Sequence, residues 1–344
     1  MPLRARDDAD HDLDASRLTT AEWTALTATN RAVRHLRTHC CGAPVVLKTS
    51  RLGTRFFAHL ALGGCASGDE SPEHLHLKAL AIAAARAAGW DAAAEVSGVT
   101  PDGAPWRADV LATRGSARIA VEVQWSPQPD DVTAARQARY ALSGVRGLWL
   151  LRGGFVPHAD VPAVRVRGSL AAGLTILGQP PADFFAAVFA GRLRFGFPAG
   201  STAAATVAGG IARCWGNGCG AVARIVTGVE FRAGESVCRM AVADLAAAPA
   251  LFAAVVAALP PDRARGQLRV TPGKAIVAEC FACRRPLTPM RAAAGRFTAA
   301  TFVLNLTPAH AAALAAQPGH APVWSLVPLA PSVRAPVAPP RQSA

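Results

Sequence analysis

The stretch from residue 106 to residue 124 constrains the fold of this chain more than any other. Two alternating segments, Trp106–Arg114 and Ala117–Gln124, are separated only by Gly115 and Ser116. A two-residue loop that begins with glycine is typical of a type II′ hairpin turn, because glycine readily takes the positive φ of the first central position. The pattern therefore predicts two antiparallel strands whose register is fixed by the turn.

That register brings two carboxylates together. It places Asp109 opposite Glu122 and Arg107 opposite Gln124. Opposite residues share one face of a sheet, with Cβ atoms roughly 4.5–5.5 Å apart, so Asp109, Glu122 and Gln124 are expected to converge. The other face is apolar and is expected to form the core. It consists of Ala108, Val110, Ala112, Ile119, Val121 and Val123.

Two carboxylates at such a separation repel each other unless a positive charge compensates them. Mg²⁺ can do so, because it binds one or two carboxylates and keeps waters that a phosphate oxygen can replace. Such an ion polarises a phosphodiester and lowers the pKa of an attacking water. The alternative interpretation is an exposed hairpin with solvated Asp109 and Glu122. A one-residue bulge would also separate the two groups.

The segments around the hairpin read as helix and strand in turn. Ser71-Pro72-Glu73 begins a helix that Gly89 ends, since serine suits the N-cap, proline the first helical position and glycine the C-terminal side. The other expected elements are strands at 92–99, 105–114 and 117–126, a helix at 130–142 and a buried strand at 147–151. The order helix, three strands, helix, strand predicts an α/β fold with a mixed sheet.

Length and composition set the broad class. A chain of 344 residues favours two or three domains, and an apolar fraction of 51% excludes a wholly disordered protein. No apolar run reaches the roughly 18 residues of a membrane helix, so no membrane insertion is expected. Residues 1–17 carry five aspartates and no apolar segment of a secretory signal, which predicts a cytoplasmic protein.

The charge balance favours a polyanionic partner. The net charge is +13, and no acidic residue occurs between Trp23 and Gly68. From Arg263 to the end, ten basic residues accompany a single acidic one, Glu279. This distribution is typical of proteins that bind nucleic acid. The alternative is a solvated basic surface whose arginine content reflects genomic composition, and the presence of only three lysines supports that bias.

The spacing of the eight cysteines indicates metal binding rather than disulfides, given the absence of a secretion signal. Cys280-Phe-Ala-Cys283 has the geometry of a zinc knuckle, and Cys214-x₄-Cys219 is its expected partner pair. Four thiolates would close a structural Zn²⁺ site that leaves no open position for catalysis. The module is therefore expected to be structural or to contact DNA. Buried free cysteines are the alternative.

Several motifs, taken together, resemble the competence protein CoiA-like family, a branch of the PD-(D/E)XK restriction-endonuclease-like nuclease superfamily. The resemblance covers about residues 38–152, and the ordered set is more specific than any one motif. The matching residues are Arg55-Phe-Phe-Ala-His59, Glu70-Ser-Pro-Glu-His74, Lys78, Trp106-Arg-Ala-Asp109-Val, Glu122-Val-Gln124-Trp-Ser126, Arg136, Arg139-Tyr140 and Gly147-Leu-Trp149-Leu.

The resemblance implies a metal-dependent nuclease that acts on DNA, with Asp109 and Glu122 holding Mg²⁺ or Mn²⁺. Gln124 stands where most of the superfamily has a lysine. Its neutral amide can orient a water but supplies no positive charge. Lys78, one helical turn after His74, is expected to compensate, the alternative being a surface lysine. His74 is expected either to orient the site or to be simply an N-terminal helix residue.

The resemblance also implies DNA contacts by residues of the second helix and the hairpin. These are Arg107, Arg136, Arg139 and Tyr140, with solvated arginines and a core tyrosine as the alternatives.

An N-terminal zinc site is expected from Cys41, His59 and Cys65. The family usually shows Cys-x-x-Cys before a histidine, whereas the pair here is the adjacent Cys40-Cys41, and His39 is the alternative ligand.

The resulting architecture is an α/β restriction-endonuclease-like core with an accessory zinc-ribbon-like module. The expected segments are a polar and basic arm at 1–37, a Cys/His zinc-finger-like segment at 38–68, the nuclease core at 69–152, a linker with a helix at 153–209, the zinc-ribbon-like domain with an insertion at 210–310 and a disordered Pro-rich tail at 330–344.

The function expected from all of this is DNA hydrolysis in competence, transformation or recombination. The expected partners are single- or double-stranded DNA and other DNA-processing proteins. The alternatives are a catalytically inert DNA-binding zinc protein derived from a nuclease, and a restriction or defence endonuclease. The sequence leaves the strand preference and the oligomeric state open.

Overall fold

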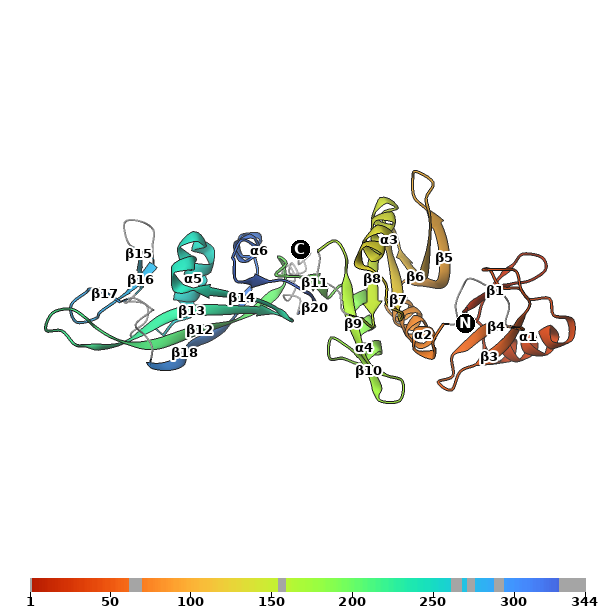
Figure 1. The fold of residues 1–344 in the computed structure, drawn as a ribbon, viewed down its shortest axis with the longest axis horizontal. Helices are drawn as coiled ribbons and strands as arrows, with labels where there is room; N and C mark the ends of the chain where they lie inside the picture. The colour runs from red at the N-terminus through yellow and green to blue at the C-terminus, as the bar shows by residue number, and fades with distance from the viewer. Residues whose placement is uncertain are drawn as a thin grey trace, which may run out of the picture. The chain divides into compact units, whose positions relative to one another are not determined.

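A computed structural model describes residues 2–61, 70–153, 159–260, 268–270, 276–287 and 294–327. The chain divides into two compact units, residues 1–191 and 192–344 (Figure 1). The predicted Pro-rich tail at 330–344 lies outside the described residues. Among the residues that are described, no helix is both long and apolar enough to cross a membrane.

The first part of the N-terminal unit is a small module that spans residues 2–61. Its elements are β1 (Arg4–Arg6), β2 (Asp12–Asp14), α1 (Thr20–Val33), β3 (Val45–Thr49) and β4 (Arg55–His59). A capping box between Thr19 and Glu22 begins α1. Trp23, Val45 and Phe57 share one core, so residues on both sides of the predicted boundary at residue 37 pack together. The expected arm packs on the expected Cys/His segment because its own apolar side chains are buried there.

The rest of the unit is built on a mixed six-stranded sheet of order β10-β9-β8-β7-β6-β5. The strands are β5 (Asp91–Val99), β6 (Pro105–Arg114), β7 (Ala117–Gln124), β8 (Arg146–Leu151), β9 (Ala163–Ser169) and β10 (Gly173–Ile176). β5, β6 and β7 are antiparallel neighbours, and β8 is parallel to both β7 and β9. The predicted α/β fold with a mixed sheet is confirmed.

Two helices frame the sheet as the sequence predicts. α2 (Pro72–Ala87) starts at Ser71, whose side chain accepts a hydrogen bond from the backbone of His74, and it packs across β5, β6 and β7. α3 (Asp130–Leu142) covers the face that carries Ala120 and Trp149. Within the stretch 153–209, expected to be a linker with one helix, β9 and β10 extend the sheet, and the helix is α4 (Pro181–Phe189), which packs against α2.

The C-terminal unit is a second, antiparallel structure. Its main sheet has the order β18-β12-β13-β14-β19 around one apolar core. Its elements are β11 (Leu193–Phe195), β12 (Thr202–Arg213), β13 (Val222–Ala233), β14 (Ser236–Ala241), η1 (Val242–Ala247), α5 (Pro249–Ala258), β15 (Leu268–Val270), β16 (Ile276–Glu279), β17 (Pro286–Leu287), β18 (Ala294–Asn305), α6 (Pro308–Ala315), β19 (His320–Ala321) and β20 (Trp324–Leu326). The two late cysteine pairs lie in the loops β12–β13 and β16–β17.

Candidate active site

The β6–β7 hairpin has the predicted turn and, near it, the predicted register. Gly115 has a φ of 58°, and the pairs run from Arg114–Ala117 to Val110–Val121. The ladder ends there, so the predicted pairing of Asp109 with Glu122 is wrong. Asp109 Oδ2 instead accepts a hydrogen bond of 2.9 Å from the backbone N–H of Val123. The carboxylate of Asp109 thus accepts a hydrogen bond from a backbone N–H of β7 that lies beyond the last strand pair.

Asp109 lies beside the first turn of α2. Its Oδ2 is 3.1 Å from Nε2 of His74. One ligand atom from each of Glu70, His74 and Asp109 lies within 4.8 Å of the others, so the three could hold a metal ion. Glu70 directly precedes the N-cap of α2 and His74 follows in its first turn. The proline-led helix start therefore places both side chains at the sheet.

The pKa of Asp109 is set by opposing influences. Burial raises it, but the contact and charge of His74, the charge of Lys78 and the N–H of Val123 outweigh burial and lower the pKa to about 2. The carboxylate is therefore ionised at any physiological pH. An ionised carboxylate is the ligand that Mg²⁺ and Mn²⁺ favour.

Lys78 lies one turn further along α2 and is fully buried. Its Nζ donates to Glu70 Oε1 at 3.0 Å and to Glu95 Oε1 at 2.7 Å. Burial alone would lower the pKa of Lys78, but the charges of Glu95, Glu70 and Asp109 raise it above its usual value. The surface-lysine interpretation is wrong, and the ammonium group belongs to the network behind Asp109.

Glu95 is a member of this network that sequence reasoning missed. It interrupts β5 with a φ of 55°, and its carboxylate, 2% exposed, also lies 3.5 Å from Arg107 Nη2. The β5–β6 pairing passes from Ala94–Val110 to Val96–Ala108 without a pair at Glu95. An acidic residue within the apolar run from Ala92 to Val96 was the signal that could have identified it.

Glu122 faces α3 rather than the cluster of Glu70, His74 and Asp109. Arg136 Nη2 donates to its Oε2 at 2.5 Å, and the hydroxyl of Tyr140 donates to its Oε1. Burial raises the pKa of Glu122, and the negative charge of Asp109 raises it further against the opposing effect of Arg136, to about 8. This mutual repulsion means that the two carboxylates are electrostatically coupled although they are not strand partners.

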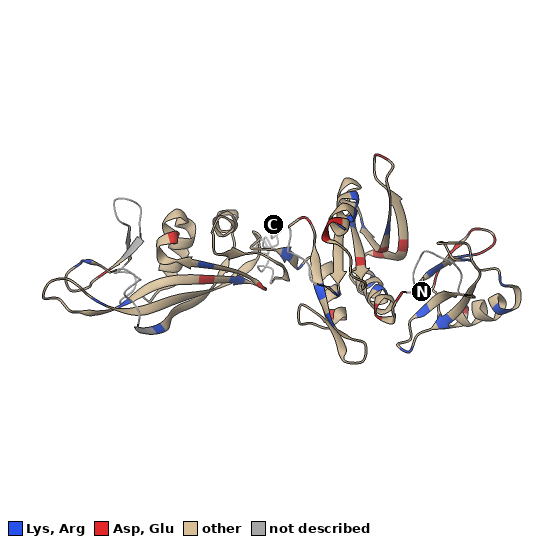
Figure 2. Ribbon diagram, viewed as in Figure 1, with Lys and Arg blue, Asp and Glu red and all other residues tan. Residues whose placement is uncertain are grey.

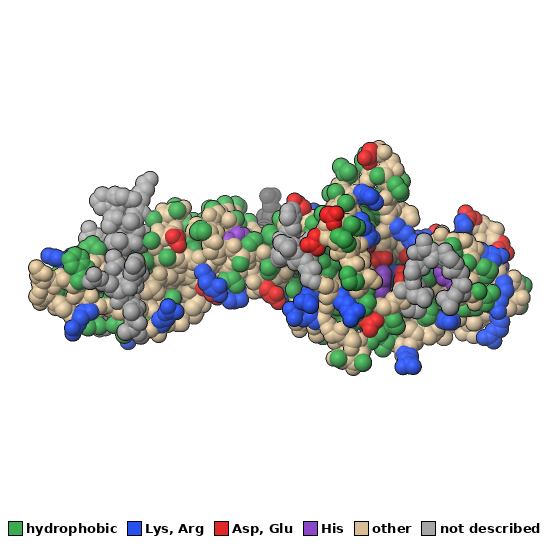
Figure 3. Space-filling model, in the orientation of Figure 1, with side chains coloured by type: hydrophobic (Ala, Val, Ile, Leu, Met, Phe, Trp, Pro, Cys, Tyr) green, Lys and Arg blue, Asp and Glu red, His purple; other side chains and the backbone are tan. Residues whose placement is uncertain are grey.

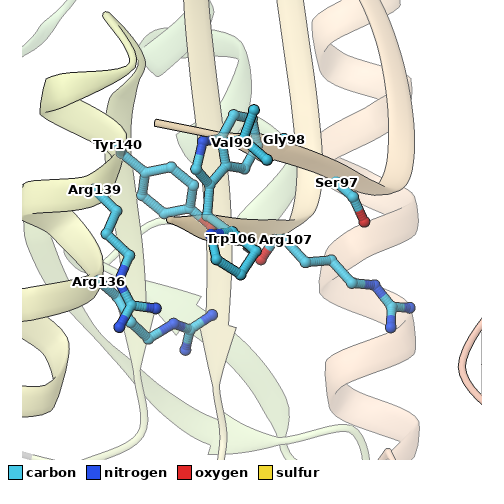
Figure 4. Close-up of a pocket in the computed structure, with 9 residues that line it drawn as sticks. Ser97, Gly98, Val99, Trp106, Arg107, Arg136, Arg139 and Tyr140 are labelled. Atoms are coloured by element: carbon cyan, nitrogen blue, oxygen red, sulfur yellow. Dashed lines mark hydrogen bonds between the residues drawn. The ribbon is translucent and has the colours of Figure 1, made fainter. Parts of the chain in front are cut away.

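A cleft of ≈ 710 Å³ opens beside Glu122. Figure 4 shows Arg136, Arg139 and Tyr140 on one side of it and Arg107 on the other, with Trp106 between. Its lining thus includes all four residues predicted to contact DNA. Tyr140 is also a core residue, since it is buried and its ring packs edge-on against Trp106 with centroids 5.3 Å apart. The remaining lining residues are Ser97, Gly98, Val99, Pro105 and Trp106.

The side chain of Gln124 makes a local hydrogen bond just beyond the end of β7. Its Nε2 donates to the backbone oxygen of Ser126 at 2.8 Å. The structure thus brings together Asp109, His74 and Lys78, adds Glu70 and Glu95, and leaves Gln124 at the end of β7 in a local hydrogen bond.

The four late cysteines form a second cluster that could hold a metal ion such as zinc. Their sulfur atoms all lie within 4.8 Å of one another, with Cys214 Sγ 3.4 Å from Cys283 Sγ and Cys219 Sγ 3.7 Å from Cys280 Sγ. The backbone N–H of Cys283 is the largest influence on Cys280 and lowers the pKa of its thiol to about 7. A thiol that ionises near neutral pH is suited to metal binding.

The N-terminal module holds a third cluster, formed by Cys40, Cys41 and His59. His59 Nε2 lies 3.3 Å from Cys41 Sγ and 3.6 Å from Cys40 Sγ, so both adjacent cysteines face the same histidine. The predicted third ligand, Cys65, lies outside the described residues. His39, the alternative ligand, is instead 2.8 Å from Asp12 Oδ1.

Comparisons with known proteins bear on the N-terminal unit. The curated proteins gave no match. A crystal structure of AF1548, a protein of unknown function, aligns at 15% identity over 25% of this chain and 58% of that chain, with a TM-score of 0.19. The alignment thus spans less than two thirds of that protein. Residues 70–158 match the family model of competence protein CoiA, nuclease-like domain, and the resemblance to the competence protein CoiA-like family is thereby confirmed for the segment that contains Glu70, His74, Asp109 and Glu122.

Proposed function

We propose that this chain is a metal-dependent nuclease that hydrolyses phosphodiester bonds in DNA. The observation that carries the proposal is the cluster of Glu70, His74 and Asp109, inside the segment that matches a nuclease-like domain. The buried Lys78 donates a hydrogen bond to Glu70, and the buried carboxylate of Glu122 is electrostatically coupled to Asp109. Such a concentration of coupled ionisable groups is typical of active sites.

Asp109 is the central metal ligand in this proposal, with Glu70 and His74 within reach of the same ion. The two carboxylates are oxygen ligands of the kind that Mg²⁺ and Mn²⁺ favour, whereas the imidazole is a ligand more typical of transition metals. When bound, the ion polarises the phosphodiester and makes a water more acidic. Glu122, the predicted second carboxylate, carries a raised pKa partly because of Asp109. A cation beside Asp109 would relieve that repulsion, so that Glu122 could ionise and act on the same ion or its water.

The remaining residues position these groups and the DNA. Lys78 holds the side chains of Glu70 and Glu95 in place through two hydrogen bonds. It supplies the positive charge that Gln124 lacks at the position of the superfamily lysine. Arg107 and Arg139 line the cleft with their side chains exposed, where they can pair with phosphates of the bound strand. The core would then be restriction-endonuclease-like, and the role would be DNA processing during competence.

A second candidate is a DNA-binding protein whose nuclease site is inert. The hydrogen bond from Gln124 to Ser126 favours it, because this amide is already committed within the chain. A restriction or defence endonuclease would use the same site as the first candidate. The two classes differ in whether the chain cuts DNA at all.

Cleavage of labelled single- and double-stranded DNA, with Mg²⁺ or Mn²⁺, decides between them. We expect cutting by the wild type that is lost in Asp109→Ala, Glu122→Ala and Glu70→Gln. Glu73→Gln is the matched control, because Glu73 lies in the same helical turn but outside the cluster. Equal cutting by all variants would place the active site elsewhere. No cutting by any, with salt-sensitive binding retained, would establish the inert DNA-binding protein.

A further inference from the structure

The cysteine cluster of the C-terminal unit carries two exposed aromatic rings. Trp215 follows Cys214 and is 52% exposed, and Phe281 follows Cys280 and is 60% exposed. The two cysteines themselves are buried and their sulfurs belong to one cluster. Large aromatic side chains are usually buried for their apolar area, so a pair displayed on one cluster indicates a binding surface. We call Trp215, Phe281 and the arginines around them the cysteine end.

The ring of Trp215 is held in a fixed position. Its Nε1 donates to the backbone oxygen of Pro286 at 3.3 Å, which ties the β12–β13 loop to the start of β17. The guanidinium of Arg285 lies 5.3 Å from the ring centre. Gly216 keeps this packing tight, because a Cβ there would lie 3.1 Å from Cδ of Arg285. A ring fixed in this way loses little freedom when a ligand stacks on it.

The exposed charges at the cysteine end are positive. No acidic residue occurs from Arg192 to Val229, and the one acidic residue of the segment 276–287, Glu279, is 6% exposed. The exposed arginines of this end are Arg213, Arg224, Arg284 and Arg285. Figure 2 shows basic residues where β12 and β13 approach their loop, and Figure 3 shows basic and hydrophobic side chains together on the visible face of that end.

We propose that the cysteine end binds single-stranded nucleic acid, with bases stacking on Trp215 and Phe281 and phosphates pairing with the arginines. Aromatic faces can stack on bases only where the bases are not already stacked in a duplex, and every base offers such a face. The arginines would pair with the phosphates of the backbone, whose charge does not depend on the base sequence. The site is separate from the Asp109 cluster, and its binding does not depend on whether that cluster cuts DNA.

The test is the affinity of the full, metal-loaded chain for a labelled oligothymidylate, followed by fluorescence anisotropy without added Mg²⁺ or Mn²⁺. Trp215→Leu should bind about fivefold more weakly or worse, because leucine keeps apolar bulk but offers no ring for stacking. Trp215→Phe should restore most of the affinity. Exposed residues elsewhere in the unit serve as controls, and Val303→Ala and Arg239→Ala should bind as the wild type does.

Two further measurements keep the result unambiguous. The metal content of each variant shows whether the cysteine cluster is intact, and the comparison of Trp215→Phe with Trp215→Leu is made at equal metal content. A duplex of the same length should bind more weakly than the single strand. Unchanged affinity in Trp215→Leu, or stronger binding of the duplex than of the single strand, would overturn the proposal.

Discussion

Lys78 Nζ lies 2.7 Å from Glu95 Oε1, and neither side chain reaches solvent by more than 2% of its surface. The pair joins α2 to an interrupted position of β5 directly behind Asp109. A buried ion pair is costly to break, because removal of one partner leaves the other as an uncompensated charge.

Replacement of Lys78 by methionine should therefore lower the free energy of unfolding by about 3–5 kcal/mol. The measurement is denaturant unfolding of the wild type, Lys78→Met, Glu95→Gln and the double variant. Because both single changes break one interaction, the double variant should lose less stability than the two single losses combined. Additive losses, or a Lys78→Met variant as stable as the wild type, would contradict the pairing.

Glu122 should give the protein a stability that falls as pH rises. Its pKa in the folded protein, about 8, lies above the ordinary value of 4.5, so the folded state retains a proton that the unfolded state has lost. Between these two values the free energy of unfolding should decrease with pH, by at most about 1.4 kcal/mol per pH unit. Glu122→Gln should flatten this dependence. Unfolding measured at intervals between pH 5 and 8 checks it, and an equal slope in both proteins would refute it.

Asp109 should act in the opposite sense. Its pKa is lowered to about 2, so its stabilising effect is complete above the pKa of the unfolded chain. That effect is lost only as pH falls from there through the folded value. Asp109→Asn should therefore differ most from the wild type near neutral pH and converge with it in acid. A difference that grows toward low pH would mean that the contacts of Asp109 do not favour its ionised form.

Replacement of Arg136 and replacement of Arg139 should have different effects, although the two residues lie three positions apart on α3. Arg139 is exposed in the cleft, so Arg139→Ala should weaken DNA binding, reduce its salt dependence and leave stability unchanged. Arg136 pairs with buried Glu122 at 2.5 Å. Arg136→Ala should lower stability and raise the pKa of Glu122 further. Binding isotherms at several salt concentrations and unfolding curves make the comparison, which fails if both variants behave alike.

Zinc should stabilise the C-terminal unit through Cys214, Cys219, Cys280 and Cys283. We expect Cys283→Ser to reduce the zinc content measured by elemental analysis and to lower the unfolding temperature. Cys238→Ala is the control, because Cys238 is buried in the main core and is not in a cluster with other ligands among the described residues. Retention of all zinc in Cys283→Ser would show that the four sulfurs do not form one site.

The sequence predicted what depends on local rules. The start of α2 at Ser71 and Pro72, the turn at Gly115 and the pairing of the late cysteines all follow from short-range steric or ligand preferences. The outcome at Asp109 could not be predicted in this way. Its side chain bonds a backbone N–H of β7 where the ladder has ended, and the hairpin rule assumes that the ladder continues.

Glu95 and the N-terminal module escaped prediction for a related reason. A positive φ at a glutamate inside a strand is unfavourable locally and is sustained only by contacts from distant segments. Those contacts come from Lys78, Arg107 and the backbone of Leu3. Residues 4–14 likewise look polar in sequence, yet Ala5 is buried and Leu13 packs against the same core.

The hydrogen bond of 2.9 Å from the backbone N–H of Leu3 to Glu95 Oε1 spans 92 residues of sequence. Arg86 and Asp14 make a second long-range link between the same two parts, 72 residues apart. Contacts this far apart in the sequence form only after a long loop has closed, which slows the folding of the segments that they join. During synthesis the first strand must therefore wait for β5 to emerge before the carboxylate behind Asp109 gains its full set of donors. Residues 2–61 and the sheet should then melt in one cooperative transition.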